Sequence, residues 1–283
     1  MTCTKVGLVV VLAAATSLGF GQTNPPNPAH PRPEVRWNIP DGPAIPGIQH
    51  FVLHSPSMDR DVGYNVFLPP GYAEGTRRYP VIYFLHGAGG NENSDAGGFS
   101  GLVKTQMAAK TIPDVICVFP NGGMSGYQDH PDEKVMGETL IVKELIPQID
   151  KQFRTIASRE GRSICGFSMG GGGSVRLLLS HPDLFSAAAS WAAALGFRRS
   201  GASAEELAKQ NVDQIKGKVR LMMVVGDKDL TFASHAPFVE TLKDLGIEFD
   251  YKVLPGIDHN LGAYYNLTGA DLVKFVAAEF PRE

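Results

Sequence analysis

Apolar and polar residues follow two patterns along this chain, and each pattern predicts one kind of element. Continuous apolar runs that end in glycine or a polar residue are typical of strands buried on both faces. They occupy residues 79–87, 114–122, 162–168, 185–193 and 219–227. Two earlier runs, 48–55 and 62–72, predict strands joined by a polar turn. The run at 248–256 alternates more, which predicts a strand nearer an edge.

Helical stretches separate these runs. Residues 137–153 place their large apolar side chains mostly on one side of a helix, with Pro147 as a predicted bend or break. Further helices are predicted within 174–182, 233–246 and 269–280. Strands that alternate with helices predict an α/β fold with a mostly parallel sheet and helices on both faces. Residues 195–211 are expected to form a small excursion over this sheet.

The N-terminal part of the chain differs in composition from the rest. Lys5, an apolar run from Val6 to about Leu18, and the small residues Gly19 and Gly21 predict a signal peptide at 1–21, cleaved near Gly21. A buried helix or a short membrane anchor is the alternative. Residues 22–46 carry eight prolines and are expected to form an exposed arm. One catalytic domain is expected over 47–283, and the exported protein would be secreted or periplasmic.

Composition narrows the classes of function. Apolar residues make up 43% of the chain, as in a globular protein with a sizeable core. The formal net charge of −3 gives no basic surface for nucleic acid. After the N-terminus, the sequence has no apolar segment long enough to predict a membrane span. Cys117 and Cys165 lie in strand-like runs and are expected to be buried free thiols.

The glycine-rich stretch CGFSMGGGG, residues 165–173, carries the first chemical signal. It lies between a predicted strand and a predicted helix and contains the pattern G-x-S-x-G around Ser168. A nucleophilic serine must project from a sharp turn, and the glycines leave room for strand and helix to cross. No lysine follows in the loop, so a phosphate-binding loop is disfavoured.

A serine nucleophile needs a base, and the base needs an orienting acid, in the chain order Ser, acid, His that accompanies this turn. His259 follows the last predicted strand, at the sheet edge where catalysis gathers. His181 and His235 are less well placed. Asp229 is favoured as the acid over Asp227, which could instead cap a turn. Asp258 adjoins His259 too closely to curl back onto its ring.

Acyl transfer also needs donors for the developing oxyanion. One backbone N–H is expected after the nucleophile, at Met169, and one in the loop after the third strand, at Ala88. Small residues around Ala88 would let the backbone approach a substrate. An ordinary glycine turn is the alternative for this loop.

Several of these segments, in this order, resemble the putative-esterase family of α/β-hydrolases, which includes esterase D, feruloyl esterases and mycolyltransferases of the antigen 85 type. The segments are YPVIYFLHGAGGNEN, VFPNG, ELIPQIDKQFR, RSICGFSMGGGGSVRLLLSHPDLF, GDKDL and PGIDHN. The resemblance implies the α/β-hydrolase fold and a Ser-Asp-His esterase of Ser168, Asp229 and His259, with donors Ala88 and Met169. It implies no metal and no organic cofactor.

The predicted substrate class depends on the predicted export of the chain. Export favours feruloyl or acyl esters of carbohydrates, or other small or oligosaccharide esters, over the intracellular thioester S-formylglutathione. An S-formylglutathione hydrolase or an acyltransferase of the same fold is the alternative, and a non-catalytic binding protein is disfavoured because all three triad residues are present. Neither a nucleic acid nor a membrane is expected as a partner after signal cleavage, and the oligomeric state is left open.

Overall fold

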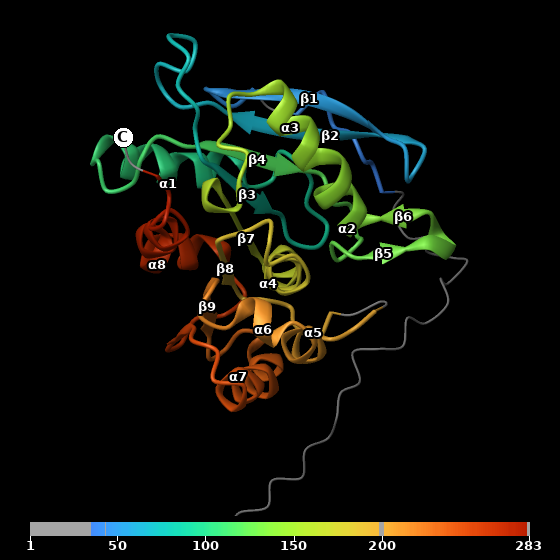
Figure 1. The fold of residues 1–283 in the computed structure, drawn as a ribbon, viewed down its shortest axis with the longest axis vertical. Helices are drawn as coiled ribbons and strands as arrows, with labels where there is room; N and C mark the ends of the chain where they lie inside the picture. Colours follow the sequence, from blue (N-terminus) through green and yellow to red (C-terminus); the bar gives the residue numbers. More distant parts are fainter. Residues whose placement is uncertain (1–34, 43, 198–200, 282–283) are drawn as a thin grey trace, which may run out of the picture.

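A central sheet organises the chain, seen here in a computed structural model that describes residues 35–42, 44–197 and 201–281. Its strand order is β1-β2-β4-β3-β7-β8-β9-β10 (Figure 1). β1 pairs antiparallel with β2, and β2 antiparallel with β4, whereas the other pairs are parallel. The strands are β1 (Ile48–Ser55), β2 (Arg60–Phe67), β3 (Val81–Leu85), β4 (Ile116–Pro120), β7 (Arg162–Phe167), β8 (Ala187–Trp191), β9 (Arg220–Gly226) and β10 (Asp250–Leu254).

Burial along the strands explains the two apolar patterns. In β3 every residue is buried, and successive side chains enter different cores. Val81, Tyr83 and Leu85 belong to one core, and Ile82 and Phe84 to the other. A strand covered on both faces must therefore be apolar throughout. β10 lies at the end of the sheet and is largely exposed, which confirms the predicted edge strand.

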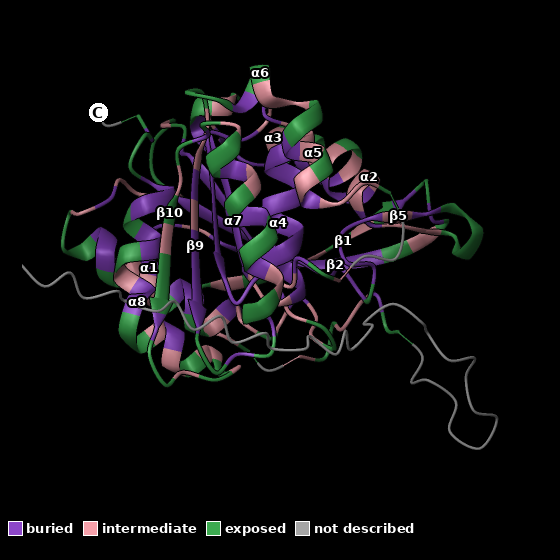
Figure 2. Ribbon diagram, turned by 90° about the horizontal axis from the view of Figure 1, so that it is seen from below, coloured by how far each residue is buried: buried purple, intermediate pink, exposed green. Residues whose placement is uncertain are grey.

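Helices cover both faces of the sheet, as predicted (Figure 2). α1 and α8 supply one core, and α4 packs on the other face together with α3, α5 and α7. The helices on the first face are α1 (Ala96–Ala108) and α8 (Leu261–Val276); those on the second are α3 (Ile146–Gln152), α4 (Met169–Ser180), α5 (Ala204–Gln210) and α7 (His235–Asp244). Shorter elements are α2 (Gly137–Thr139), α6 (Val212–Ile215), the π-helical turn η2 (Leu140–Leu145), three 3-10 turns and the hairpin of β5 (Asp129–His130) and β6 (Val135–Met136).

The prediction at Pro147 is a bend or a break, and the structure shows no break. The π-helical turn η2 ends just before α3 begins at Ile146, Pro147 lies in the first turn of α3, and Ile146 N–H donates to the Ile141 carbonyl. One helical boundary needs correction. The last helix starts at Leu261 rather than near Gly269. Helix α1 was not predicted, because its glycines conceal the apolar positions that pack against β3 and α8.

The described part of the proline-rich arm is mostly exposed or half-buried, except at Trp37. Trp37 is only 9% exposed, and Gly63 N–H in β2 donates to its carbonyl at 2.7 Å. The predicted signal peptide and residues 22–34 lie outside the described residues. Among the helices that are described, none combines the length and the apolar character that crossing a membrane requires.

Candidate active site

Ser168 stands at the sharp turn between β7 and α4. Its backbone has φ 57° and ψ −116°, a strained conformation for a residue with a side chain. Backbone hydrogen bonds hold it there: Ser168 N–H donates to the Trp191 carbonyl, and its own carbonyl accepts from Gly172 and Ala194, all at 2.9 Å. The turn is therefore locked to the end of the neighbouring strand β8.

The glycines around this turn are required by close approach. A Cβ on Gly170 would lie 2.0 Å from the Leu85 carbonyl oxygen, and one on Gly166 would lie 2.5 Å from the same atom. Both distances are too short for any side chain. The first turn of α4 thus crosses directly over the end of β3, as the sequence pattern predicted.

The three predicted triad residues meet in space. His259 Nε2 lies 2.9 Å from Ser168 Oγ, and His259 Nδ1 lies 2.9 Å from both carboxylate oxygens of Asp229. The Phe167 ring lies beside the imidazole, with centroids 4.6 Å apart. Loops that follow β7, β9 and β10 supply the three side chains, so all of them gather at the carboxyl edge of the parallel strands.

The Asp229 side chain is fully shielded from solvent and richly hydrogen-bonded. Its Oδ1 accepts from Thr231 N–H at 2.8 Å and from Thr231 Oγ1 at 2.7 Å, and its Oδ2 accepts from Tyr264 OH at 2.8 Å. Burial raises the pKa of Asp229, but hydrogen bonds from His259, Thr231 and Tyr264 outweigh it and lower the pKa to about 2. The carboxylate is therefore ionised at neutral pH and faces the imidazole.

Tyr264 and Thr231 are site residues that the sequence analysis missed. Thr231 stands two residues after Asp229, a spacing at which a backbone N–H can reach an aspartate side chain. Tyr264 is in the first turn of α8 and also accepts from Gly226 N–H at 2.8 Å. The sequence offered no comparable signal for Tyr264, because that helix was predicted to start later.

The competing candidates have other partners. Asp227 Oδ1 accepts from Gly256 N–H at 2.7 Å, so this residue caps a turn. His235 is buried and faces the Ala193 carbonyl at 3.0 Å. His181 Nε2 lies 2.7 Å from Glu138 Oε1, at the far end of α4. Cys117 and Cys165 are buried free thiols, as predicted.

The two predicted oxyanion donors lie on adjoining segments. Met169 opens helix α4, where the first N–H groups point outward and the helix dipole favours negative charge. Ala88 lies in the turn closed by Gly90 N–H to the Gly87 carbonyl at 3.0 Å. A Cβ on Gly87 would lie 3.5 Å from Ser168 Cβ, so this turn borders the serine. Neither the Ala88 nor the Met169 N–H has a hydrogen-bond acceptor among the described residues.

His86 holds the turn that contains Gly87 and Ala88 through its imidazole ring. Its Nε2 accepts from Gly122 N–H at 2.9 Å, which places the proton on Nδ1, 2.8 Å from the Gly87 carbonyl. Burial lowers the pKa of His86 to about 4. The ring is therefore neutral at pH 7, and its two hydrogen bonds connect the loop after β3 with the loop after β4.

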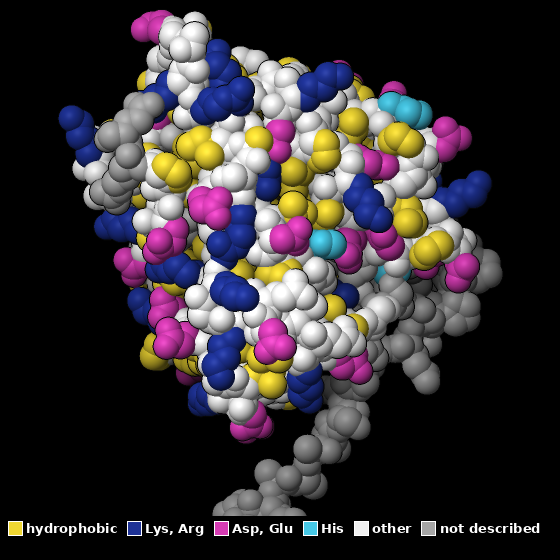
Figure 3. Space-filling view, viewed as in Figure 1, with side chains coloured by type: hydrophobic (Ala, Val, Ile, Leu, Met, Phe, Trp, Pro, Cys, Tyr) yellow, Lys and Arg dark blue, Asp and Glu magenta, His cyan; other side chains and the backbone are white. Residues whose placement is uncertain are grey.

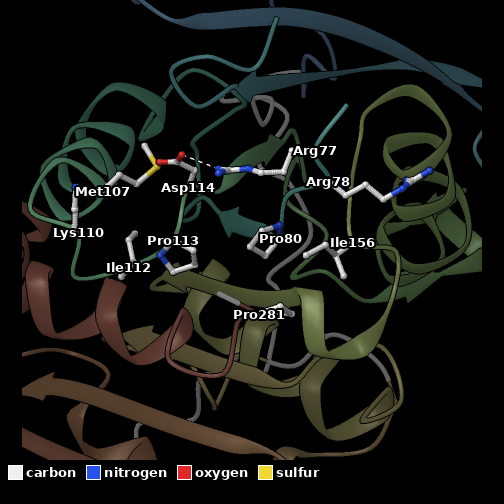
Figure 4. A pocket seen from close by; sticks show the side chains of 10 residues that line it. All are labelled: Arg77, Arg78, Pro80, Met107, Lys110, Ile112, Pro113, Asp114, Ile156 and Pro281. Atoms are coloured by element: carbon white, nitrogen blue, oxygen red, sulfur yellow. Dashed lines mark hydrogen bonds and ion pairs between the residues drawn. The ribbon is translucent and has the colours of Figure 1, made fainter. Parts of the chain in front are cut away.

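A hollow of about 660 Å³ lies at the opposite edge of the sheet (Figure 4). Most of its lining residues precede β3, β4 or β7, and Pro281 follows α8; Arg77 there pairs with Asp114 at 2.7 Å. It is therefore separate from Ser168.

The face in Figure 3 intersperses acidic and basic side chains without a continuous basic area. Within the described ranges, no group of three or more His, Cys, Asp or Glu is arranged to hold a metal.

A family model described as "Putative esterase" matches residues 55–261. The chain belongs to the putative esterase family. It is 32% identical over 158 residues to Esterase Rv1288 of Mycobacterium tuberculosis, covering 54% of this chain and 34% of that protein. It is 34% identical over 152 residues to an endo-1,4-beta-xylanase/feruloyl esterase of Xylanibacter ruminicola, covering 49% and 20%. This family member thus spans about a third or less of the length of these relatives.

Solved structures place this member of the family in the α/β-hydrolase fold, as predicted. A ferulic acid esterase superimposes with a TM-score of 0.71 at 24% identity, covering 82% of this chain and 98% of that one. An S-formylglutathione hydrolase from Agrobacterium tumefaciens gives a TM-score of 0.69 at 19% identity, covering 86% and 100%. At these identities the likeness concerns the fold, and it does not distinguish one ester from another.

Proposed function

We propose that this chain is a secreted serine ester hydrolase that works through an acyl-enzyme on Ser168. The observation that carries the proposal is the continuous hydrogen-bonded series from Ser168 Oγ through the His259 ring to the buried Asp229 carboxylate. A serine, a base in contact with it and an acid that orients the base are the parts that covalent acyl transfer requires.

In the acylation step, Ser168 Oγ attacks the ester carbonyl carbon while His259 Nε2 takes the hydroxyl proton. Asp229 holds the proton on His259 Nδ1, which leaves Nε2 free to accept, and stabilises the imidazolium that forms. The Ala88 and Met169 N–H groups receive the negative charge on the former carbonyl oxygen. The tetrahedral intermediate then breaks its bond to the alcohol, which leaves with the proton from His259.

Deacylation repeats these roles with water. His259 Nε2 accepts a proton from water as the water oxygen attacks the acyl carbon. The bond to Ser168 Oγ breaks, and the serine recovers its proton from the imidazolium. The products are the carboxylic acid and the free enzyme, so every proton and bond is accounted for by the substrate, one water molecule and these side chains.

We propose feruloyl or acyl esters of carbohydrates, or other small esters, as the substrate class. The relative named endo-1,4-beta-xylanase/feruloyl esterase supports this choice. The N-terminal pattern of Lys5, the apolar run and Gly19/Gly21 supports export. N-terminal sequencing of protein from the native host should begin near Gln22, and an intact Met1 on intracellular protein would refute export.

The mechanism is tested by substitution within the triad. Ser168→Ala should lower turnover by about 10³-fold or more and abolish labelling by a fluorophosphonate. Asp229→Asn should lower kcat by about 10³-fold or more, because the amide can hold the wrong imidazole tautomer. Asp227→Asn is the matched control, since an amide oxygen can still accept from Gly256 N–H. Undiminished labelling of the serine variant, or a larger loss at Asp227, would overturn the assignment.

The substrate class is tested with one hydrolysis panel on the purified protein. It contains p-nitrophenyl acetate, methyl ferulate, acetylated xylan oligosaccharides, S-formylglutathione and a triglyceride emulsion. We expect higher kcat/KM on methyl ferulate or an acetylated saccharide than on either of the last two. The reverse ranking would reject this substrate class and leave the mechanism standing. Adding alcohol acceptors to the same assay detects acyl transfer as a new ester product.

A further inference from the structure

Part of the proline-rich arm is bound to the catalytic edge of the domain by buried polar groups. The Arg36 carbonyl accepts from Asn121 Nδ2 at 3.0 Å, and Ile39 N–H donates to Glu92 Oε1 at 2.5 Å. Asn121 and Glu92 are 0% and 1% exposed, and they bond to each other at 2.6 Å. Buried polar groups of this kind are costly unless satisfied, so the arm completes a network that the domain alone would leave short of partners.

The side chains of the arm press on the turn that follows β4. A Cβ on Gly123 would lie 2.8 Å from the Trp37 ring and 2.9 Å from the Val35 side chain, so both rest directly on this glycine. Gly123 has φ 53°, and its N–H donates to Asn121 Oδ1 at 3.0 Å. We call residues 35–39 the strap and residues 121–127 the β4 turn.

The β4 turn in turn holds the loop that carries Ala88 at three points. Gly122 N–H donates to His86 Nε2 at 2.9 Å, and Tyr127 OH donates to the His86 carbonyl at 3.2 Å. Gly89 N–H, next to Ala88, donates to the Met124 thioether sulfur at 3.1 Å. Gly122 and Met124 each lie one residue from a strap contact, on Asn121 or Gly123, and Tyr127 lies four residues from Gly123.

We propose that the strap positions the Ala88 N–H for the oxyanion, acting through the β4 turn. It is a positioning element, since none of its described contacts is with Ser168, Asp229 or His259. Oxyanion stabilisation depends on donors held at a fixed place before the charge develops, so loosening their support lowers kcat more than it weakens substrate binding. The inference rests on the proposed ester hydrolysis and gives that site a second, remote requirement.

The test uses the full chain with Trp37→Ala, and with Trp37→Phe as the conservative variant. Met58→Ala is the matched control, because Met58 shares the small apolar cluster of Trp37 but lies in the turn between β1 and β2. For each protein we would titrate active sites by the p-nitrophenyl acetate burst. We would then measure kcat, KM and the Ki of a trifluoromethyl ketone, which forms a tetrahedral adduct with an oxyanion.

Trp37→Ala should lower kcat and raise the ketone Ki by about 10-fold each, with KM changed less than threefold. Trp37→Phe and Met58→Ala should stay within threefold of the wild-type chain in both quantities. Glu92→Gln provides a second variant should Trp37→Ala fail to fold. Its amide would place a donor against either Ile39 N–H or the Asn121 Nδ2 group, so it should show the same parallel change.

The inference would be overturned if Trp37→Ala and Met58→Ala had equal kcat and equal Ki. If Trp37→Ala does not fold, the inference would be overturned by a Glu92→Gln variant with the kcat and Ki of the wild-type chain. So would a raised KM with unchanged kcat and Ki, because the strap would then contact substrate instead. Failure of the proposed function itself is distinguishable. In that case the wild-type chain would show neither a burst nor fluorophosphonate labelling.

Discussion

Tyr264→Phe should weaken both the fold and the proposed catalysis, whereas the same change at the next residue should not. The Tyr264 hydroxyl makes two bonds at 2.8 Å, donating to Asp229 Oδ2 and accepting from Gly226 N–H. The Tyr265 hydroxyl is buried and has no hydrogen-bond partner among the described residues. Each of the two substitutions, Tyr264→Phe and Tyr265→Phe, therefore removes one hydroxyl oxygen from α8. The first hydroxyl makes two hydrogen bonds, and the second has no hydrogen-bond partner among the described residues.

The expected magnitude follows from these contacts. A hydrogen bond to a charged group contributes about 1.5–3 kcal/mol, and a buried N–H left without an acceptor costs about 1–3 kcal/mol. Allowing for partial relaxation, Tyr264→Phe should lower the free energy of unfolding by about 2–4 kcal/mol. Tyr265→Phe removes a buried hydroxyl with no described partner, so it should be neutral or slightly stabilising. Losing one of the donors that hold Asp229 should also lower kcat, by about 10-fold.

The assay is urea unfolding at pH 7 together with kcat on p-nitrophenyl acetate for the wild-type chain and both variants. The Asp229 pKa should rise in Tyr264→Phe, since the bond from Tyr264 helps to lower it. Equal destabilisation by the two substitutions would refute the reasoning, because the two hydroxyl groups would then contribute alike. A stable Tyr264→Phe with wild-type kcat would show that Thr231 and His259 suffice to hold Asp229.

Three further predictions follow from other contacts. Burial lowers the pKa of His235 to about 4, so the folded chain binds fewer protons than the unfolded chain, and stability should fall as pH drops from about 6.5 to 4. His235→Gln should make the free energy of unfolding, measured with urea at pH 7, 5 and 4, depend less steeply on pH. An unchanged pH dependence would contradict this role of His235. Met124→Leu should lower kcat by about threefold by removing the acceptor of Gly89 N–H, and Met124→Gln should restore it; equal kcat in both would reject that role. Gly170→Ala should lower the free energy of unfolding by several kcal/mol or prevent folding. Gly101 is an exposed helical site with no neighbour within 4 Å, so Gly101→Ala should add about 0.5–1 kcal/mol to the free energy of unfolding and raise the melting temperature. The opposite order of melting temperatures would refute the packing argument.

Local patterns were enough to predict most of the sheet and the identity of the three residues that meet. Every central strand coincides with a continuous apolar run, because a strand covered on both faces has no place for polar side chains. The meeting of Ser168, Asp229 and His259 was predictable because parallel strands direct their following loops to one edge. The glycines at 166 and 170 were informative for a similar reason, since close backbone crossing excludes a side chain whatever the rest of the fold.

Tertiary structure alone decided how these parts are supported. Tyr264 reaches Asp229, and the strap reaches Asn121 and Glu92, across 35 to 85 positions of sequence. No periodicity encodes such contacts, because they depend on the paths of loops and on which buried polar groups still need a partner. Helix α1 forms despite its glycines for the same reason: burial of Phe99 and Val103 against the sheet outweighs the weak helical propensity of the segment.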